Sequence, residues 1–346
     1  MLALCLPLLM SQPIHAQHPS NGTPYCLPKT AINVTLLIEK KSQRPGELNQ
    51  YASRFLKKND VATTASTTYR IVNMRMDAIG LPDTTKQFTA RVDDKHSIER
   101  VELSTSGIIL AVNTDPAPTT QVHQPFKPAP KTPLPNPHDY MNQDILSAGS
   151  TAKMAELTAQ EIYDIRDSRS LLTKGQADFM PKDGEQLRIM MESLNQQEKA
   201  LLQVFEGTTT CDTTEVTLTY IPRREGRELL FRFSSKLGMV DNDDLAGEPF
   251  YIQIDDLHSR PVNNTVAEGK VNKDDANIFI NLPGRIKATI AEGNAERSSL
   301  ELYAAQFGTT ERLDTELFGR KLYTTLVYNP VTGNLESQKT DLIKKK

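Results

Sequence analysis

The residues best suited to chemistry are four carboxylates that lie close together in the sequence, Asp241, Asp243, Asp244 and Glu248. Carboxylate oxygens are the ligands that Ca²⁺ prefers in proteins. The spacing departs from that of an EF-hand loop, because Ala246 stands where the loop needs Gly and Ile252 stands where it needs Glu. We therefore interpret the segment as a polar turn between strands. A calcium site is the alternative, and we expect no other metal site.

The chain offers few residues for nucleophilic or acid–base catalysis. It contains no HExxH, GxSxG, Walker A, GxGxxG or CxxC motif, and these are the signatures of metalloproteases, serine hydrolases, nucleotide-binding folds and zinc ribbons. Only His96 and His258 lie in segments that we expect to fold. A thiol hydrolase that uses Cys211 and His258 is an alternative on residue types alone. We assign no catalytic residue and no cofactor.

Carboxylates are plentiful, and a glycosidase needs only two of them at the right separation. The chain has no Trp and only 6% aromatic residues, whereas sugar-binding clefts usually stack pyranose rings on aromatic faces. A carboxylate-based hydrolase of glycan or peptide therefore remains the alternative to a non-enzymatic protein.

Residues 1–16 form a short apolar run that ends in the small residue Ala16, which is typical of a secretory signal peptide. The run is too short to span a membrane. The net charge is −3 with both signs interspersed, which does not favour nucleic acid as a partner. We expect export to the periplasm, the cell surface or the medium, with no transmembrane segment in the mature chain.

Cys26 and Cys211 are the two cysteines that remain once residues 1–16 are removed. An even number of cysteines in an oxidising compartment favours pairing. Each cysteine also precedes an expected strand, so a sheet that aligns the two strand starts would bring the sulfur atoms together. The sequence therefore leaves two options, a Cys26–Cys211 disulfide or two separate thiols.

Residues 144–207 predict two antiparallel helices joined by a short connector. Lys174 and Gly175 mark the end of the first helix, and Asp183 with Gln186 predicts a capping box at the start of the second. Apolar residues recur in the second helix at spacings of three, four and seven, so we expect this side to be buried. These residues are Leu187, Met190, Met191, Leu194, Leu201 and Phe205.

Two charges interrupt the apolar faces of this hairpin, Glu198 on the second helix and Arg169 on the first. Counting from the connector places Arg166 level with Glu192 and separates Arg169 from Glu198 by about 13 Å along the axis. We therefore predict that Arg166, Arg169, Glu192 and Glu198 belong to a structural polar network between the hairpin and a β layer, with Glu198 buried. An active-site carboxylate and a charge that reaches solvent are the alternatives.

The rest of the chain predicts β structure on both sides of the hairpin. Residues 25–113 form a β-rich unit with one helix, whose apolar stripe from Leu48 to Leu56 should pack on the sheet. Residues 208–340 form an antiparallel β domain, with a turn at residues 328–334 that folds the last strand back. Residues 114–143 are rich in proline and predict a linker or surface strap. The fold class is α+β, mainly antiparallel and sandwich-like, with an inserted helical hairpin.

Several stretches resemble an uncharacterised family of secreted Bacteroidota proteins, a domain-of-unknown-function family. The resemblance covers nearly all of the mature chain, and its most specific parts are MPKDGE and QQEKALLQVFEGT. The other stretches are YCLPKTAINV, PGELNQYASRFL, AKMAELTAQEIYDIRDSR, LLFRFS with LGMVDNDDLAGEP, AAQFG and YNPVTGNLE. The resemblance implies an envelope or periplasmic setting and supplies no catalytic residues. We expect an exported, non-enzymatic protein that binds another macromolecule, either an envelope protein or a polysaccharide.

Overall fold

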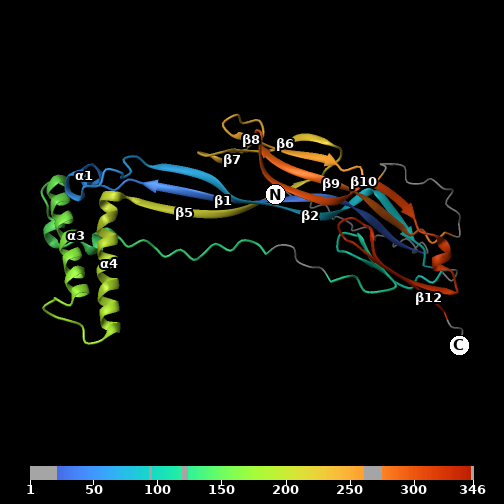
Figure 1. Ribbon diagram of the computed structural model, residues 1–346, viewed down its shortest axis with the longest axis horizontal. Helices are drawn as coiled ribbons and strands as arrows, with labels where there is room; N and C mark the ends of the chain where they lie inside the picture. Colours follow the sequence, from blue (N-terminus) through green and yellow to red (C-terminus); the bar gives the residue numbers. More distant parts are fainter. Residues whose placement is uncertain (1–21, 93–95, 119–123, 261–274, 344–346) are drawn as a thin grey trace, which may run out of the picture.

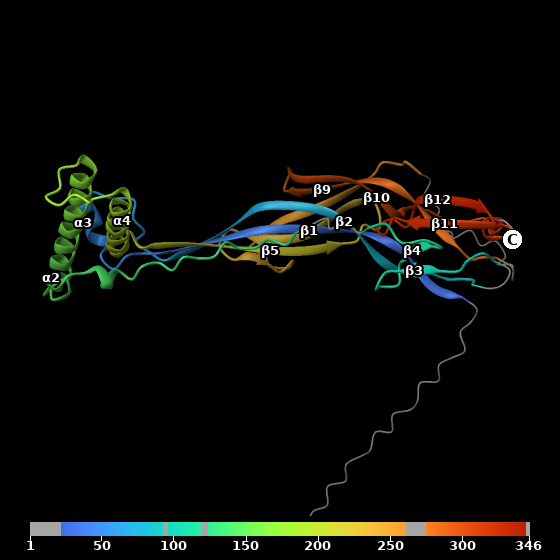
Figure 2. The same cartoon turned by 90° about the horizontal axis from the view of Figure 1, so that it is seen from below.

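The computed structural model describes residues 22–92, 96–118, 124–260 and 275–343. The expected signal segment, residues 1–16, lies outside these residues. The described chain is elongated, with a helical bundle at one end and three β-sheets toward the other (Figures 1 and 2). Three long strands connect the two ends.

The connecting sheet consists of β1 (Thr23–Arg44), β2 (Ser66–Ala90) and β5 (Thr208–Tyr220) in the antiparallel order β2-β1-β5. A strand as long as β1 spans roughly 70 Å at about 3.3 Å per residue. Apolar residues alternate along its middle at Ile32, Val34, Leu36 and Ile38, and all four are buried. This face of β1 therefore belongs to a core.

That core lies between the connecting sheet and a five-stranded antiparallel sheet. The strands are β6 (Gly226–Ser234), β7 (Gly238–Val240), β8 (Glu248–Asp256), β9 (Phe279–Glu292) and β10 (Ala295–Arg312), in the order β10-β9-β8-β6-β7. Phe231, Phe250, Ile252, Ile286 and Ile290 supply its side of the core. The two packed antiparallel sheets confirm the sandwich-like α+β class expected from the sequence.

A third sheet covers the beginning of β1. It contains β3 (Val101–Leu103), β4 (Ile109–Val112), β11 (Leu322–Tyr328) and β12 (Leu335–Leu342) in the order β12-β11-β4-β3. Tyr25, Leu27, Ile109, Leu326 and Phe318 of the 3₁₀ turn η3 (Thr315–Phe318) form its core. β12 pairs antiparallel with β11, which confirms the predicted turn at residues 328–334. We call the second and third sheets, with the part of the connecting sheet that packs on them, the β body.

The helical bundle contains η1 (Asn49–Tyr51), α1 (Ala52–Leu56), η2 (Pro137–Tyr140), α2 (Gln143–Leu146), α3 (Thr151–Lys174) and α4 (Gly184–Glu206). The predicted helical hairpin is confirmed as α3 and α4. The stripe at Leu48, Ala52 and Leu56 packs against α3 and α4. The prediction that it packs on the sheet is wrong, because the β1–β2 connection lies beyond the body, where only helices are within reach (Figure 1).

The two predicted β units, residues 25–113 and 208–340, share their sheets. β1 pairs with β5 along Ile32–Arg44, and β4 pairs with β11. The edge position of the long strand β2 tolerates Pro82. The proposed boundary between two β domains is therefore wrong, since each unit supplies hydrogen-bond partners that the other needs.

From residue 124 on, the proline-rich segment runs along the connecting sheet to the bundle (Figure 1). The Phe126 N–H donates to Glu215 Oε2 at 3.1 Å, and Lys131 forms an ion pair with Asp212. At its far end Gln203 Nε2 on α4 donates to the Pro135 carbonyl at 3.0 Å. We call described residues 124–136 the strap; the last part of the predicted linker, residues 137–140, forms η2 in the bundle.

Candidate functional site

The predicted polar network is an ion triad inside the helical hairpin. Glu198 on α4 is buried, with 8% of its surface exposed, as predicted. Arg166 Nε donates to its Oε1 at 2.6 Å, and Arg169 Nη1 donates to its Oε2 at 2.5 Å. Both arginines lie on α3, so the carboxylate joins two points of one helix to the other.

Two details of the predicted network are wrong. The partners of Glu198 lie in the hairpin and not in a β layer. Counting residues outward from the connector misplaced them, because connector 175–183 allows one helix to be shifted along the other. The long arginine side chains also reach across the remaining distance. Glu192 is outside the triad. It accepts a hydrogen bond from Arg188 Nη1 on its own helix at 2.9 Å and is exposed.

The triad is suited to a structural role. Burial alone would raise the pKa of the Glu198 carboxyl, but hydrogen bonds and charge from Arg166 and Arg169 outweigh it and lower that pKa. The carboxylate therefore stays ionised and occupied by two guanidinium groups. A general acid or nucleophile needs a free or proton-bearing carboxyl, which this geometry does not provide.

The connector end of the hairpin is closed by the caps that the sequence predicted. Gly175 has a positive φ of 70°, and Gln176 N donates back to the Leu171 carbonyl at 2.9 Å. Asp183 Oδ1 accepts from Gln186 N at 2.7 Å, while Gln186 Oε1 accepts from Lys182 N at 3.0 Å. The two helix ends are thus held in place.

Beyond the triad, the apolar side of α4 stays partly open to solvent. Leu201 and Phe205 are buried, whereas Leu194, Met190 and Leu187 are only half-buried. The expectation that the whole side is buried is wrong, because α1 and α2 cover only the part of the hairpin nearer the sheet. The apolar periodicity continues past the last element that packs on it.

This open part forms a cleft with a volume of about 520 Å³ between α3, α4 and the connector. Phe179 is 72% exposed and Ile189 is 54% exposed, so large apolar side chains face solvent at its rim. We call it the hairpin cleft, lined chiefly by Leu171, Leu172, Phe179, Ile189, Met190 and Leu194.

The acidic segment forms the turn between β7 and β8 and not a metal site. Asp244 Oδ1 accepts from Ala246 N at 2.8 Å, and Arg232 donates to the carbonyls of Asn242 and Gly247 at 2.9 Å each. A guanidinium therefore occupies the turn where Ca²⁺ was the alternative. Within the described residues no group of three or more His, Cys, Asp or Glu side chains is placed to hold a metal, so Asp241, Asp243, Asp244 and Glu248 do not converge.

Cys26 and Cys211 are separate thiols within the chain, which resolves the two options in favour of the second. Cys211 on β5 lies opposite Lys41, near the end of β1 that leads to the bundle, whereas Cys26 lies near the other end of β1. At about 3.3 Å per residue the two cysteines are roughly 50 Å apart, far beyond the Cα separation of about 7 Å that a disulfide allows. The strand starts do not align, because β1 and β5 are antiparallel.

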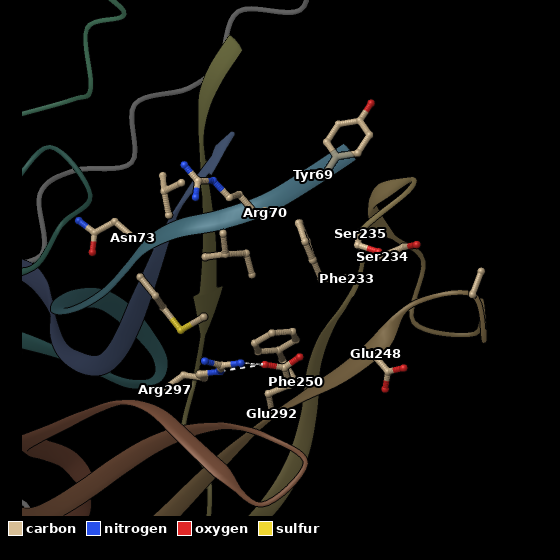
Figure 3. A pocket seen from close by; sticks show the side chains of 14 residues that line it. Tyr69, Arg70, Asn73, Phe233, Ser234, Ser235, Glu248, Phe250, Glu292 and Arg297 are labelled. Atoms are coloured by element: carbon tan, nitrogen blue, oxygen red, sulfur yellow. Dashed lines mark hydrogen bonds and ion pairs between the residues drawn. The ribbon is translucent and has the colours of Figure 1, made fainter. Parts of the chain in front are cut away.

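A second hollow, of about 620 Å³, lies between the edge of β2 and the five-stranded sheet (Figure 3). Two carboxylates line it, Glu248 and Glu292, and a carboxylate hydrolase needs two such groups at the right separation. The Glu292 carboxylate turns toward Arg297, whose Nε donates to it at 2.8 Å. A carboxylate held by a guanidinium is poorly suited to donate a proton.

The β2 edge beside this hollow is also poorly suited to pair with a further strand. Opposite β2, Leu37 pairs with Asn73 and Ile38 pairs with Ile71, so Val72 is an extra residue in a bulge. A bulge on an edge strand disturbs the regular hydrogen-bonding groups that an added strand would need. We assign no function to this hollow.

A family model described as a domain of unknown function, DUF4831, matches residues 21–336. No curated protein and no solved structure matches the chain. None of the helices in the described residues is long and apolar enough to cross a membrane.

Proposed function

Since the chain belongs to the DUF4831 family, whose description assigns no activity, we propose its role from the site itself. We propose that it is an exported, non-enzymatic protein of the cell envelope that binds another protein through the hairpin cleft. The observation that carries this proposal is the group of large apolar side chains exposed at one end of a projecting hairpin.

Exposed apolar side chains that gather in one cleft are a common mark of a protein-binding surface. Phe179 and Ile189 expose much of their apolar surface. A partner that covers this surface would gain about 25 cal/mol of binding free energy for each Å² of apolar surface buried. Met190 adds an unbranched side chain that adapts to different partners. We therefore propose a partner that offers apolar side chains, such as an envelope protein, in preference to a polysaccharide.

The position of the cleft also supports binding. The three long strands hold the helical bundle away from the β body, and the free end of the hairpin projects from the bundle (Figure 1). The ion triad and the two helix caps keep the hairpin ordered without help from the body. A preorganised surface loses less conformational entropy on binding.

The export part of the proposal rests on residues 1–16 and on the resemblance to secreted Bacteroidota proteins. Cell fractionation followed by N-terminal sequencing tests it directly. We expect the envelope or medium fraction to contain a chain that begins at Gln17. A cytoplasmic chain that retains residues 1–16 would contradict export.

The binding part can be tested by photo-crosslinking in intact cells of the native organism. A photoreactive residue at Ile189 should give a discrete adduct with one envelope protein, whereas one at Leu245, which is 82% exposed in the β7–β8 turn, should not. Phe179→Ser should reduce the yield of the Ile189 adduct. Equal labelling from both positions, or a yield that Phe179→Ser leaves unchanged, would contradict the proposal.

A carboxylate hydrolase is the lesser candidate. It would depend on Glu248 and Glu292 in the hollow beside β2, where Arg297 occupies one of the two carboxylates. No observation favours it over the hairpin cleft.

A further inference from the structure

A third cavity, of about 710 Å³, lies in the β body at the opposite end of the connecting sheet from the hairpin cleft. Two irregular segments line it. In β2, residues 83–86 fall outside the pairing with β1, whose register shifts between Cys26 and Pro28. In β10, residues 305–308 fall outside the pairing with β9. Bulges of this kind often aim side chains at a functional site.

The β10 bulge is held in one conformation by close backbone packing. A Cβ atom added at Gly284 would overlap the Phe307 carbonyl oxygen, and one added at Gly308 would overlap the Leu282 carbonyl oxygen. Gln306 then ties the bulge to its surroundings. Its Oε1 accepts from Thr30 N at 2.9 Å, and its Nε2 donates to the carbonyls of Thr30 at 2.7 Å and Pro222 at 3.0 Å. The wall of the cavity is therefore built into the fold.

Lys86 reaches the cavity from the β2 bulge with a neutral partner. Its Nζ donates to Asn281 Oδ1 at 3.2 Å, and Asn281 is 0% exposed. Burial lowers the pKa of Lys86, and the nearby charge of Asp83 acts in the opposite direction. An ammonium group has three donors, and within the described chain Lys86 makes no ion pair.

Three further cations line the same cavity, Lys29, Arg223 and Arg224, and none has an ion-pair partner among the described residues. Arg223 and Arg224 follow directly after Pro222, the residue that Gln306 holds in place. The cavity thus brings together four cationic side chains, and within the described residues most of their donors have no partner.

The carboxylates of the cavity do not satisfy these cations. Asp256 accepts from His258 N at 2.8 Å and lies 3.3 Å from His258 Nδ1. Asp83 accepts from the N–H and the hydroxyl of Thr85 at 3.0 Å and 2.7 Å. Glu225 is exposed beside Arg224. Four cations thus meet three carboxylates, of which two already have partners.

We propose that this cavity is a binding site for a small oxyanion ligand, one that carries a phosphate or carboxylate group. Lysine and arginine are the side chains that bind such groups through charge-assisted hydrogen bonds. The volume lies within the range of about 300 to 1,000 Å³ typical of small-molecule sites. The ligand group would contact the partly buried Lys86 and Lys29 and the exposed Arg223 and Arg224 that line the cavity.

Isothermal titration calorimetry of the full mature chain with inorganic phosphate and, separately, with succinate tests this site. We expect saturable one-to-one binding of at least one of the two, and the stronger ligand identifies the type of oxyanion. Arg223→Ala combined with Arg224→Ala should weaken binding about tenfold or more, since hydrogen bonds to charged groups are strong. Both arginines are exposed, so the variant should fold.

Two further variants make the test specific. Lys86→Met should also weaken binding about tenfold, with thermal unfolding measured in parallel to confirm that it folds. Lys339→Ala removes an exposed cation from β12, outside the cavity, and should change the dissociation constant less than twofold. No saturable binding of phosphate or succinate to the unaltered chain, or an equal loss in Lys339→Ala, would overturn the proposal.

Discussion

The helical bundle and the β body each bury a polar side chain, and they satisfy it in different ways. In the bundle, Glu198 is charged and lies between two arginines of one neighbouring helix. In the body, the neutral Asn281 amide donates to the carbonyls of Pro28 and Thr332 at 2.9 Å each and accepts from Thr310 at 2.9 Å. In the bundle, opposite charges satisfy the buried side chain. In the body, one amide is satisfied by hydrogen bonds to several segments that lie far apart in the sequence.

This difference has physical consequences. An ion triad weakens when low pH protonates its carboxylate or when salt screens its charges. A side-chain amide has no group that titrates at the pH where carboxylates do. Removing the amide leaves several buried polar groups without hydrogen-bond partners, and each such group lowers the free energy of unfolding. The body should therefore be more sensitive to substitution, and the bundle more sensitive to pH.

Asn281→Leu should have the largest effect on stability. It keeps a similar volume but leaves the Pro28 and Thr332 carbonyls, the Thr310 hydroxyl and the Lys86 ammonium without their partner. We expect a loss of about 3 to 5 kcal/mol in the free energy of unfolding, because each unsatisfied buried group costs roughly 1 to 3 kcal/mol. Urea denaturation measures it. Asn73→Leu, at an exposed position in β2, is the control and should change stability by about 0.5 kcal/mol or less.

Glu198→Leu should have the second largest effect, because it leaves Arg166 and Arg169 without their carboxylate. Breaking a buried ion pair costs about 3 to 5 kcal/mol. We expect about 2 to 3 kcal/mol here, since both arginine side chains are 32% exposed and can turn toward water.

Glu192→Leu is the matched control on the same helix. Its pair with Arg188 is exposed to solvent, and surface ion pairs contribute little to stability. Equal melting temperatures for the two variants would show that the triad does not stabilise the hairpin.

The effect of pH on the stability of the hairpin should be smaller than the effects of Asn281→Leu and Glu198→Leu, and it should be confined to α3 and α4. The Glu198 pKa in the folded chain lies below the ordinary value of 4.5. The unfolded chain therefore binds the proton more readily, so the contribution of Glu198 to stability is present above about pH 4.5 and is lost as the pH falls through the folded pKa. Amide hydrogen exchange from pH 6 down to pH 3 should show α3 and α4 losing protection before β9. Glu198→Gln should remove this pH dependence, and simultaneous loss in both regions of the unaltered chain would contradict it.

The smallest effect should follow cleavage of the proline-rich segment. The strap within it is held by a few contacts and supplies little apolar surface to either core. Limited proteolysis should cut first between residues 114 and 142, and the nicked chain should keep a melting temperature close to that of the intact chain. First cuts within α3 or α4 would show instead that the hairpin is the less stable part.

Much of the local structure could be predicted from the sequence. The caps at Gly175 and Asp183, the turn at residues 328–334 and the burial of Glu198 depend on residues within one or two helical turns or one hairpin, so spacing and residue type suffice. The exposed part of α4 was also visible in the sequence as apolar periodicity, because Leu187 and Met190 continue the apolar side beyond the part that α1 and α2 cover.

Other features depended on tertiary structure, for a common physical reason. The pairing of β1 with β5, the distance between Cys26 and Cys211 and the partners of Glu198 all depend on the relative position of distant segments, and a small shift in register changes every contact. The cavity between the bulges of β2 and β10 could not be foreseen either. Lys29, Lys86 and Arg223 meet there only because two long strands leave their regular pairing at the same place, and no local pattern of residue types encodes that coincidence.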